Sequence, residues 1–173
     1  MAKKITALPG DLLNLSNQVK NRIADIVPRV IAAEGQRHFE MSWQNQGFTD
    51  NTLSKWRKRQ FNQKRYRKDR APTAAYKKFQ AKDRGRAILV SHQTDTKGTH
   101  LKDSIRTTWD RNKVEFATDK VYAQVHNEGG HAGRGKGFEM PQRQFMGPSE
   151  ALDKAIEAKL DREITKMLDN IKF

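Results

Sequence analysis

The 173-residue sequence contains no cysteine and no long hydrophobic run. Without cysteine the chain can form neither disulfide bonds nor a zinc site with thiolate ligands, and a reducing cytoplasm is the expected place of synthesis. No stretch approaches the roughly 20 apolar residues that a membrane-spanning helix needs. The N-terminal stretch MAKKITALPGD has lysines but no apolar region behind them, so we expect no secretory signal and no membrane partner.

Hydrophobic residues are also scarce. They make up 35% of the chain, and the mean hydropathy is −0.93, whereas compact globular domains are usually about 45–50% apolar. We therefore do not expect a core that extends over the whole length. Part of the chain should gain order from a partner protein or from another subunit.

Basic side chains outnumber acidic ones. The sequence has 34 Lys and Arg and 20 Asp and Glu, which gives a net charge of +14. Residues 55–86 hold 14 of the basic side chains and two Asp, a net of +12, which leaves only +2 for the other 141 residues. Like charges repel and little apolar surface is present there, so this segment should not fold alone. We predict an extended basic arm inserted into a single domain that covers residues 1–173.

Two helices are predicted ahead of this arm. Apolar residues recur in steps of three and four from Leu12 to Ile26, and Asp11 can cap the first helix. Pro28 interrupts the pattern, and proline is tolerated in the first turn of a helix. A second helix should therefore start near Pro28 and run to about Trp43, with one kinked helix as the alternative.

Residues 45–60, where the helices lead into the arm, read as a loop anchored by Phe48 and Trp56. Short strands are predicted after the arm. Period-two alternation predicts a hairpin of 103–110 with 112–118 and a three-residue turn at 110–112. Further strands are expected at 87–91 and 121–126, and a flexible glycine-rich loop at 131–139.

A closing helix gives the strongest periodic signal. Ser149 can cap it, and its apolar residues form one continuous stripe: Leu152, Ile156, Leu160, Ile164, Met167, Leu168 and Ile171. The predicted fold class is α+β, with N-terminal helices, a small antiparallel sheet of three to four strands and a C-terminal amphipathic helix. The helices should cover one face of the sheet.

Catalytic chemistry has little support in the sequence. A metalloprotease helix places two histidines four residues apart, but His126 and His131 are five apart and separated by glycines. The glycines of 133–137 lack the spacing of a phosphate-binding loop. We predict no metal, no cofactor and no catalytic residue. A small hydrolase that uses His126 and Glu128 is the weakest alternative.

Three stretches occur in a fixed order ahead of the last helix: GTHLKDSI (98–105), VYAQVHNEGG (121–130) and MPQRQFMGPS (140–149). In this the chain resembles the tailed-phage virion morphogenesis family of tail-completion or head–tail joining proteins. The matching residues are Gly98, Leu101, Ser104, Ile105, Tyr122, Ala123, His126, Gly129, Gly130, Pro141, Arg143, Phe145 and Gly147. Two departures are an extra residue in TKGTHL and Met146 in place of leucine. The basic insertion is longer than the resemblance leads one to expect, so its role cannot be carried over.

The resemblance implies a structural, non-enzymatic subunit at the neck or tail end of the virion, assembled in the host bacterial cytoplasm. It would join the completed tail to the DNA-filled head by protein–protein docking. Expected partners are further copies in a ring, and neighbouring neck, connector or tail-terminator proteins. Candidate interface residues are Tyr122, His126, Arg143 (paired with an acidic group) and Phe145 (as an apolar anchor). The alternative for Phe145 is that it fills its own core.

The basic arm supports a second hypothesis, a nucleic-acid-binding accessory protein with phage DNA as its partner. Clustered Lys and Arg with interleaved aromatic residues suit phosphates and bases, although the arm could equally dock onto an acidic protein. The candidate contacts are Arg57, Lys58, Arg59, Lys64, Arg65, Arg67, Lys68 and Arg70.

Overall fold

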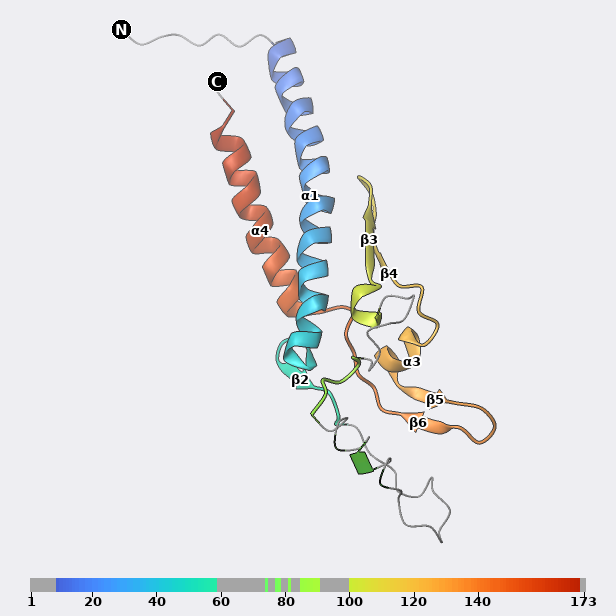
Figure 1. Ribbon diagram of the computed structural model, residues 1–173. Helices are drawn as coiled ribbons and strands as arrows, with labels where there is room; N and C mark the ends of the chain where they lie inside the picture. The colour runs from blue at the N-terminus through green and yellow to red at the C-terminus, as the bar shows by residue number, and fades with distance from the viewer. Residues whose placement is uncertain are drawn as a thin grey trace.

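The computed structural model describes residues 9–58, 74, 77, 78, 81, 85–90 and 100–171. The fold is α+β (Figure 1). Its elements are α1 (Pro9–Asn45), β1 (Gly47–Thr49), β2 (Leu53–Lys55), the 3-10 turn η2 (Leu101–Asp103), β3 (Arg106–Trp109), β4 (Val114–Ala117), α3 (Ala123–Glu128), β5 (Gly130–Ala132), β6 (Phe138–Met140) and α4 (Glu150–Asp169). Most of the predicted basic arm lies outside the described residues.

The segment ahead of the first hairpin is one helix, the stated alternative to two. Helix α1 begins at Pro9, ahead of the predicted cap, and continues through Pro28. A proline inside a helix removes one hydrogen bond and costs about 3 kcal/mol. Val30 and Phe39, which follow it, are 6% and 4% exposed. Burial of such side chains yields roughly 1.5–3 kcal/mol each, which offsets the cost, so the prediction of a second helix was wrong.

Helix α4 runs back along α1, so the start of α1 and the end of α4 lie at the same end (Figure 1). Its predicted cap is confirmed, because Ser149 Oγ accepts a hydrogen bond from the Leu152 backbone N–H at 3.1 Å. Asp50 adds to the cap, since its side-chain Oδ1 accepts from Glu150 N at 2.9 Å. Two of the four unpaired backbone N–H groups at the start of α4 thereby gain a side-chain acceptor.

Residues 47–55, predicted as loop, form the β1–β2 hairpin. Strands of three residues are too short for an alternation to be recognised. Phe48 and Trp56 are anchors as predicted, at 4% and 6% exposure. The carbonyl of Thr49 accepts from Ser149 Oγ at 2.9 Å, which ties this hairpin to the start of α4.

The predicted pairing of residues 103–110 with 112–118 is confirmed as β3–β4. Thr107 faces Phe116 and Trp109 faces Val114. The turn is not the predicted three residues, since residues 110–113 link the last pair, and Asp110 Oδ1 accepts from Lys113 N. The Phe116 ring packs where a Cβ on Gly35 would lie only 2.3 Å from its Cζ, so glycine allows the hairpin to reach α1.

The other two predicted strands are absent from the described residues. Residues 87–90 form turns, and 121–126 contribute to helix α3. Short apolar runs fit either structure on periodicity alone. The described residues consequently form three separate two-stranded sheets rather than one of three to four strands, and the loop predicted at 131–139 is the β5–β6 hairpin. Within the described part of the chain, no helix is long and apolar enough to cross a membrane.

Candidate docking site

The three motif stretches converge on one aromatic core. Each contributes a buried side chain, namely Leu101, Ala123 and Phe145, and Phe145 has no exposed surface. Trp43 from α1 and Trp56 beyond β2 complete the cluster. The Trp43 ring centroid lies 5.0 Å from that of Phe145 and 6.0 Å from that of Trp56. The structure therefore shows the alternative stated for Phe145, a ring that fills its own core.

Residues 141–147, which we call the connector, are held on one side by a single asparagine. Asn127 Oδ1 accepts from the backbone N–H groups of Phe145 (2.9 Å) and Met146 (3.1 Å). On the other side, Ser42 Oγ of α1 donates to the Phe145 carbonyl at 3.2 Å. Since an unpaired buried backbone group is costly, these bonds fix the path of the connector through the core.

Two further bonds extend this anchoring. Trp56 Nε1 donates to the Gln144 carbonyl at 2.6 Å, and Arg143 N donates to the His126 carbonyl at 2.7 Å. Every residue from 143 to 146 thus has a main-chain group bonded to another part of the chain. The connector is therefore a fixed base and not a loose loop.

Sequence reasoning did not single out Asn127 or Ser42. Asn127 lies four residues after Ala123, and residues at this spacing share a helix face. The helix places Ala123 in the core and Asn127 about 6 Å further along against the connector, whereas in a strand four residues would span about 13 Å. The missed helix therefore hid the role of Asn127, and no pattern marks Ser42.

Arg143 is 7% exposed, although its interface role was predicted from its charge. Its Nε donates to the Arg57 carbonyl at 3.2 Å, and Nη1 lies 3.5 Å from Met140 Sδ. The guanidinium thus joins the connector to the start of the basic segment. Contact with an acidic group of a partner stays a prediction.

His126 and Tyr122 lie together at α3. Their ring centroids are 5.9 Å apart at an interplanar angle of 87°. His126 Nδ1 is buried and has no hydrogen-bond partner in the described part of the chain. Burial lowers the pKa of His126, and the Arg143 guanidinium lowers that pKa further. This favours a neutral packing histidine beneath Tyr122, which is 42% exposed.

The groups needed for hydrolase chemistry are spread apart in different contacts. The Glu128 carboxylate accepts from Gln124 Nε2 at 3.1 Å, while His131 Nδ1 lies 3.5 Å from Glu139 Oε1 on β6. A general base needs an orienting partner, and among the described residues none is bonded to His126 Nδ1. Among the described residues no cluster of three or more His, Cys, Asp or Glu could hold a metal ion.

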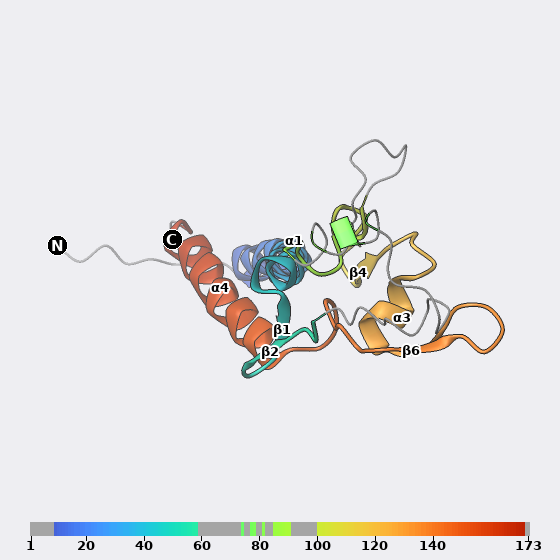
Figure 2. The ribbon, with the colours of Figure 1, turned by 60° about the horizontal axis from the view of Figure 1, so that its bottom comes forward.

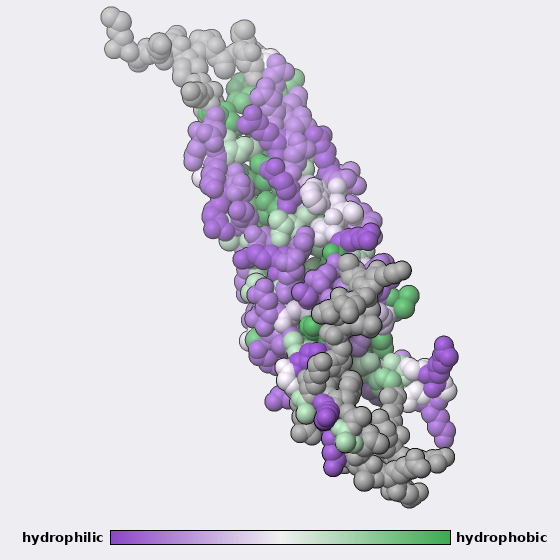
Figure 3. Space-filling model, viewed as in Figure 1, coloured by the Kyte–Doolittle hydropathy of each residue, from purple (hydrophilic) through white to green (hydrophobic). Residues whose placement is uncertain are grey.

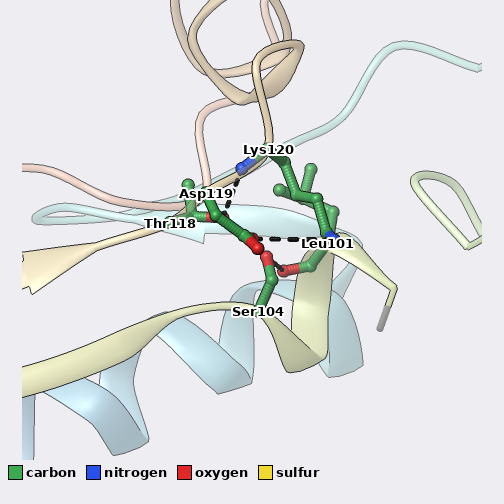
Figure 4. Close-up of polar contacts among 5 residues, drawn as sticks. All are labelled: Leu101, Ser104, Thr118, Asp119 and Lys120. Carbon is green, nitrogen blue, oxygen red and sulfur yellow. Dashed lines mark hydrogen bonds and ion pairs between the residues drawn. The ribbon is translucent and has the colours of Figure 1, made fainter. Parts of the chain in front are cut away.

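The first motif stretch forms a small hydrogen-bond network with residues 118–120 beside the core (Figure 4). Ser104 Oγ donates to the Leu101 carbonyl at 2.8 Å and lies 2.6 Å from Thr118 Oγ1. Because the serine has only one proton, the threonine hydroxyl is the donor in the second bond. Thr118 Oγ1 in turn accepts from Lys120 N at 3.3 Å. These hydrogen bonds connect η2 to the segment that leads into α3. Gly98, which also belongs to the first motif stretch, lies outside the described residues.

The β5–β6 hairpin with its glycine-rich turn, residues 130–140, projects away from α1 and α4 and has no buried residue (Figures 1 and 2). We call it the ribbon. At its base Gly129 adopts φ 79°, and a Cβ there would lie 3.0 Å from Gln142 N, so glycine lets the ribbon and connector approach. Three large hydrophobic residues near this region are exposed: Val121 at 97%, Tyr122 at 42% and Phe138 at 42%.

The two ends of the basic segment meet at Gln46. Its carbonyl accepts from Trp56 N at 2.8 Å, and its side-chain Oε1 accepts from Ile88 N. Of the predicted nucleic-acid contacts, Arg57 and Lys58 are exposed. The others, Arg59, Lys64, Arg65, Arg67, Lys68 and Arg70, lie outside the described residues.

Comparison with known proteins gives one match. The model of the phage virion morphogenesis family matches residues 54–165, which is more than half of the chain. The match includes all three motif stretches, the ribbon and most of α4. No curated protein and no solved structure matches the chain.

Proposed function

The chain belongs to the phage virion morphogenesis family, and on this premise we propose that it is a structural, non-enzymatic protein of the neck or tail end. In this role it completes the tail and joins it to the DNA-filled head by docking onto neighbouring neck, connector or tail-terminator proteins. Its place of action is then the virion, after assembly in the host cytoplasm.

One observation carries the proposal: a tightly anchored base presents a ribbon without any buried residue. The connector below it is bonded at consecutive residues to α1, α3 and the segment after β2. A two-stranded hairpin alone is marginally stable in water. A partner that covers residues 130–140 would supply the packing that the subunit does not.

The contact surface we propose consists of Tyr122 with Val121 and the ribbon. Val121 is almost fully exposed, and an exposed apolar side chain on an anchored segment suits a pocket on a partner. His126, Arg143 and Phe145 support this surface from beneath, so substitutions there would impair assembly mainly through folding. Ring formation with further copies remains part of the proposal.

The role is tested by electron microscopy of lysates from a phage with a stop codon in this gene. We expect filled heads beside separate or misfinished tails, and intact virions when the wild-type gene is supplied in trans. A matched silent substitution at the same codon is the control. Normal virions from the stop-codon phage would contradict the proposal.

Nucleic-acid binding by the basic segment is a second candidate function. Arg57 and Lys58 are exposed directly after Trp56, so the charged run leaves the core at a fixed point. Replacement of the eight candidate contacts by glutamine should abolish DNA binding and its steep salt dependence. These residues are Arg57, Lys58, Arg59, Lys64, Arg65, Arg67, Lys68 and Arg70. The control replaces Lys154, Lys159, Arg162 and Lys166 on α4. Binding that survives the first set of changes rules out the arm.

A further inference from the structure

Helix α1 extends well beyond its partner helix. Its 37 residues span about 55 Å and the 20 residues of α4 about 30 Å. Helix α4 begins beside the C-terminal end of α1, where Ser149 bonds to Thr49. The first turns of α1 therefore extend past α4, as Figure 1 shows. We call residues 12–19 the overhang.

This end of the helix pair exposes leucines. Leu12 and Leu13 of the overhang are 57% and 63% exposed, and Leu168 near the end of α4 is 48% exposed. Figure 3 shows hydrophobic side chains on the surface toward the end where α1 begins and α4 ends. Clustered exposed apolar residues typically mark a contact surface.

The overhang is also a poor helix former on its own. Asn14, Ser16 and Asn17 have low helix propensity. Helices depend mainly on packing of an apolar face for their stability, and only Leu15 and Val19 of the overhang are even partly buried. A helix here thus requires a surface that covers it.

Charge identifies that surface. Residues 12–19 contain no charged side chain, although 31% of the chain is charged. Two copies with +14 each repel one another, so a contact between copies is favoured where charge is absent. Interface cores are in general depleted of charged residues. An acidic partner, in contrast, would find no lysine or arginine on this stretch.

Charge also sets the orientation. Trp56, at the start of the basic segment, is bonded to Gln46 at the opposite end of α1, about 40–50 Å from the overhang. Parallel pairing would place two segments of net +12 side by side. Antiparallel pairing holds them farther apart than the Debye length of about 10 Å at 0.1 M salt. We propose that the overhang binds the overhang of a second copy in antiparallel orientation, whatever the role in tail assembly.

Sedimentation equilibrium of the full-length protein tests the contact. The double variant Leu12→Glu, Leu13→Glu should raise the dimer dissociation constant at least about tenfold, because four apolar contacts per dimer are lost. Leu53→Glu, at another exposed leucine (41%), is the matched control and should leave the constant unchanged. Far-UV circular dichroism checks that each variant folds. A monomeric wild-type protein, or weaker association in the control alone, would overturn the proposal.

Disulfide cross-linking tests the orientation without background, because the chain has no cysteine. In antiparallel pairing position 12 meets position 19 of the other copy. A mixture of Leu12→Cys and Val19→Cys proteins should therefore cross-link faster than either variant alone, since a disulfide needs Cα atoms within about 7 Å. Faster cross-linking of each variant with itself would show parallel pairing and overturn the antiparallel arrangement.

Discussion

The ribbon and the connector are neighbours in the sequence and opposites in the structure. Residues 130–140 include no buried residue, whereas the connector holds Arg143 at 7% and Phe145 at 0% exposure. The ribbon meets few other elements, while the connector is bonded to α1, α3 and Trp56. The motif stretches therefore supply the core of the subunit, whereas the stretch between them adds no buried residue to it, and for this reason we propose it as the contact surface.

Helix α3 positions both the connector and the ribbon. Asn127 on α3 fixes the connector, and Gly129 at the end of α3 starts the ribbon. Because the connector passes through the core, its geometry also sets the direction in which the ribbon leaves. Substitutions in the two regions should therefore separate folding from docking.

The largest expected difference lies between the two phenylalanines. Phe145→Ala empties a fully buried site and should lower the free energy of unfolding by about 3–5 kcal/mol. Phe138→Ala in the ribbon should lower it by less than about 0.5 kcal/mol. Urea unfolding followed by tryptophan fluorescence measures both. Equal losses in the two variants would break the comparison.

Asn127→Ala tests the connector by its hydrogen bonds alone. The change leaves the N–H groups of Phe145 and Met146 without an acceptor, so we expect a loss of about 2–3 kcal/mol in the free energy of unfolding. Gln124→Ala, which removes an exposed bond on the same helix, is the control and should cost about 0.5 kcal/mol or less. A variant at Asn127 as stable as this control would show that the connector is held otherwise.

A smaller effect concerns pH. Burial lowers the pKa of His126 in the folded state, and it also lowers that of His38. The folded state therefore resists protonation of both rings. Their contribution is fully present above the unfolded pKa of about 6.5 and is lost as pH falls through the lowered folded values.

Replacement of His126 by glutamine should consequently flatten the fall in unfolding free energy below pH 6.5. The remaining slope should include the share of His38, which the double variant His126→Gln, His38→Gln removes. Urea midpoints between pH 5 and pH 8 provide the measurement. A slope unchanged by either substitution would mean that neither ring is kept neutral by burial.

Much of the fold was predictable where the sequence is strongly periodic. The α4 stripe, its Ser149 cap and the β3–β4 pairing are confirmed, and the family resemblance is confirmed by the match over residues 54–165. The prediction failed at residues 121–126, where a short apolar run fits a strand or a helix. It failed again at Pro28, because packing outweighs the local preference of proline.

The site was predictable only in part. The motif stretches contain residues that meet in one core. The interface roles of Phe145 and Arg143 are expected from their residue types alone, whereas burial depends on contacts with residues far away in the chain. Trp56 meets Gln144 across 88 residues and Ser42 meets Phe145 across 103. No local pattern encodes such pairs.

Complementation of the stop-codon phage with a ribbon-surface variant tests the central claim most directly. Val121→Asp, Phe138→Asp alters exposed side chains only, so the purified protein should unfold at the same urea midpoint as the wild type. Lysates should nonetheless contain filled heads and separate tails. Intact virions produced by this folded variant would contradict the claim that the ribbon surface docks the subunit onto its partner.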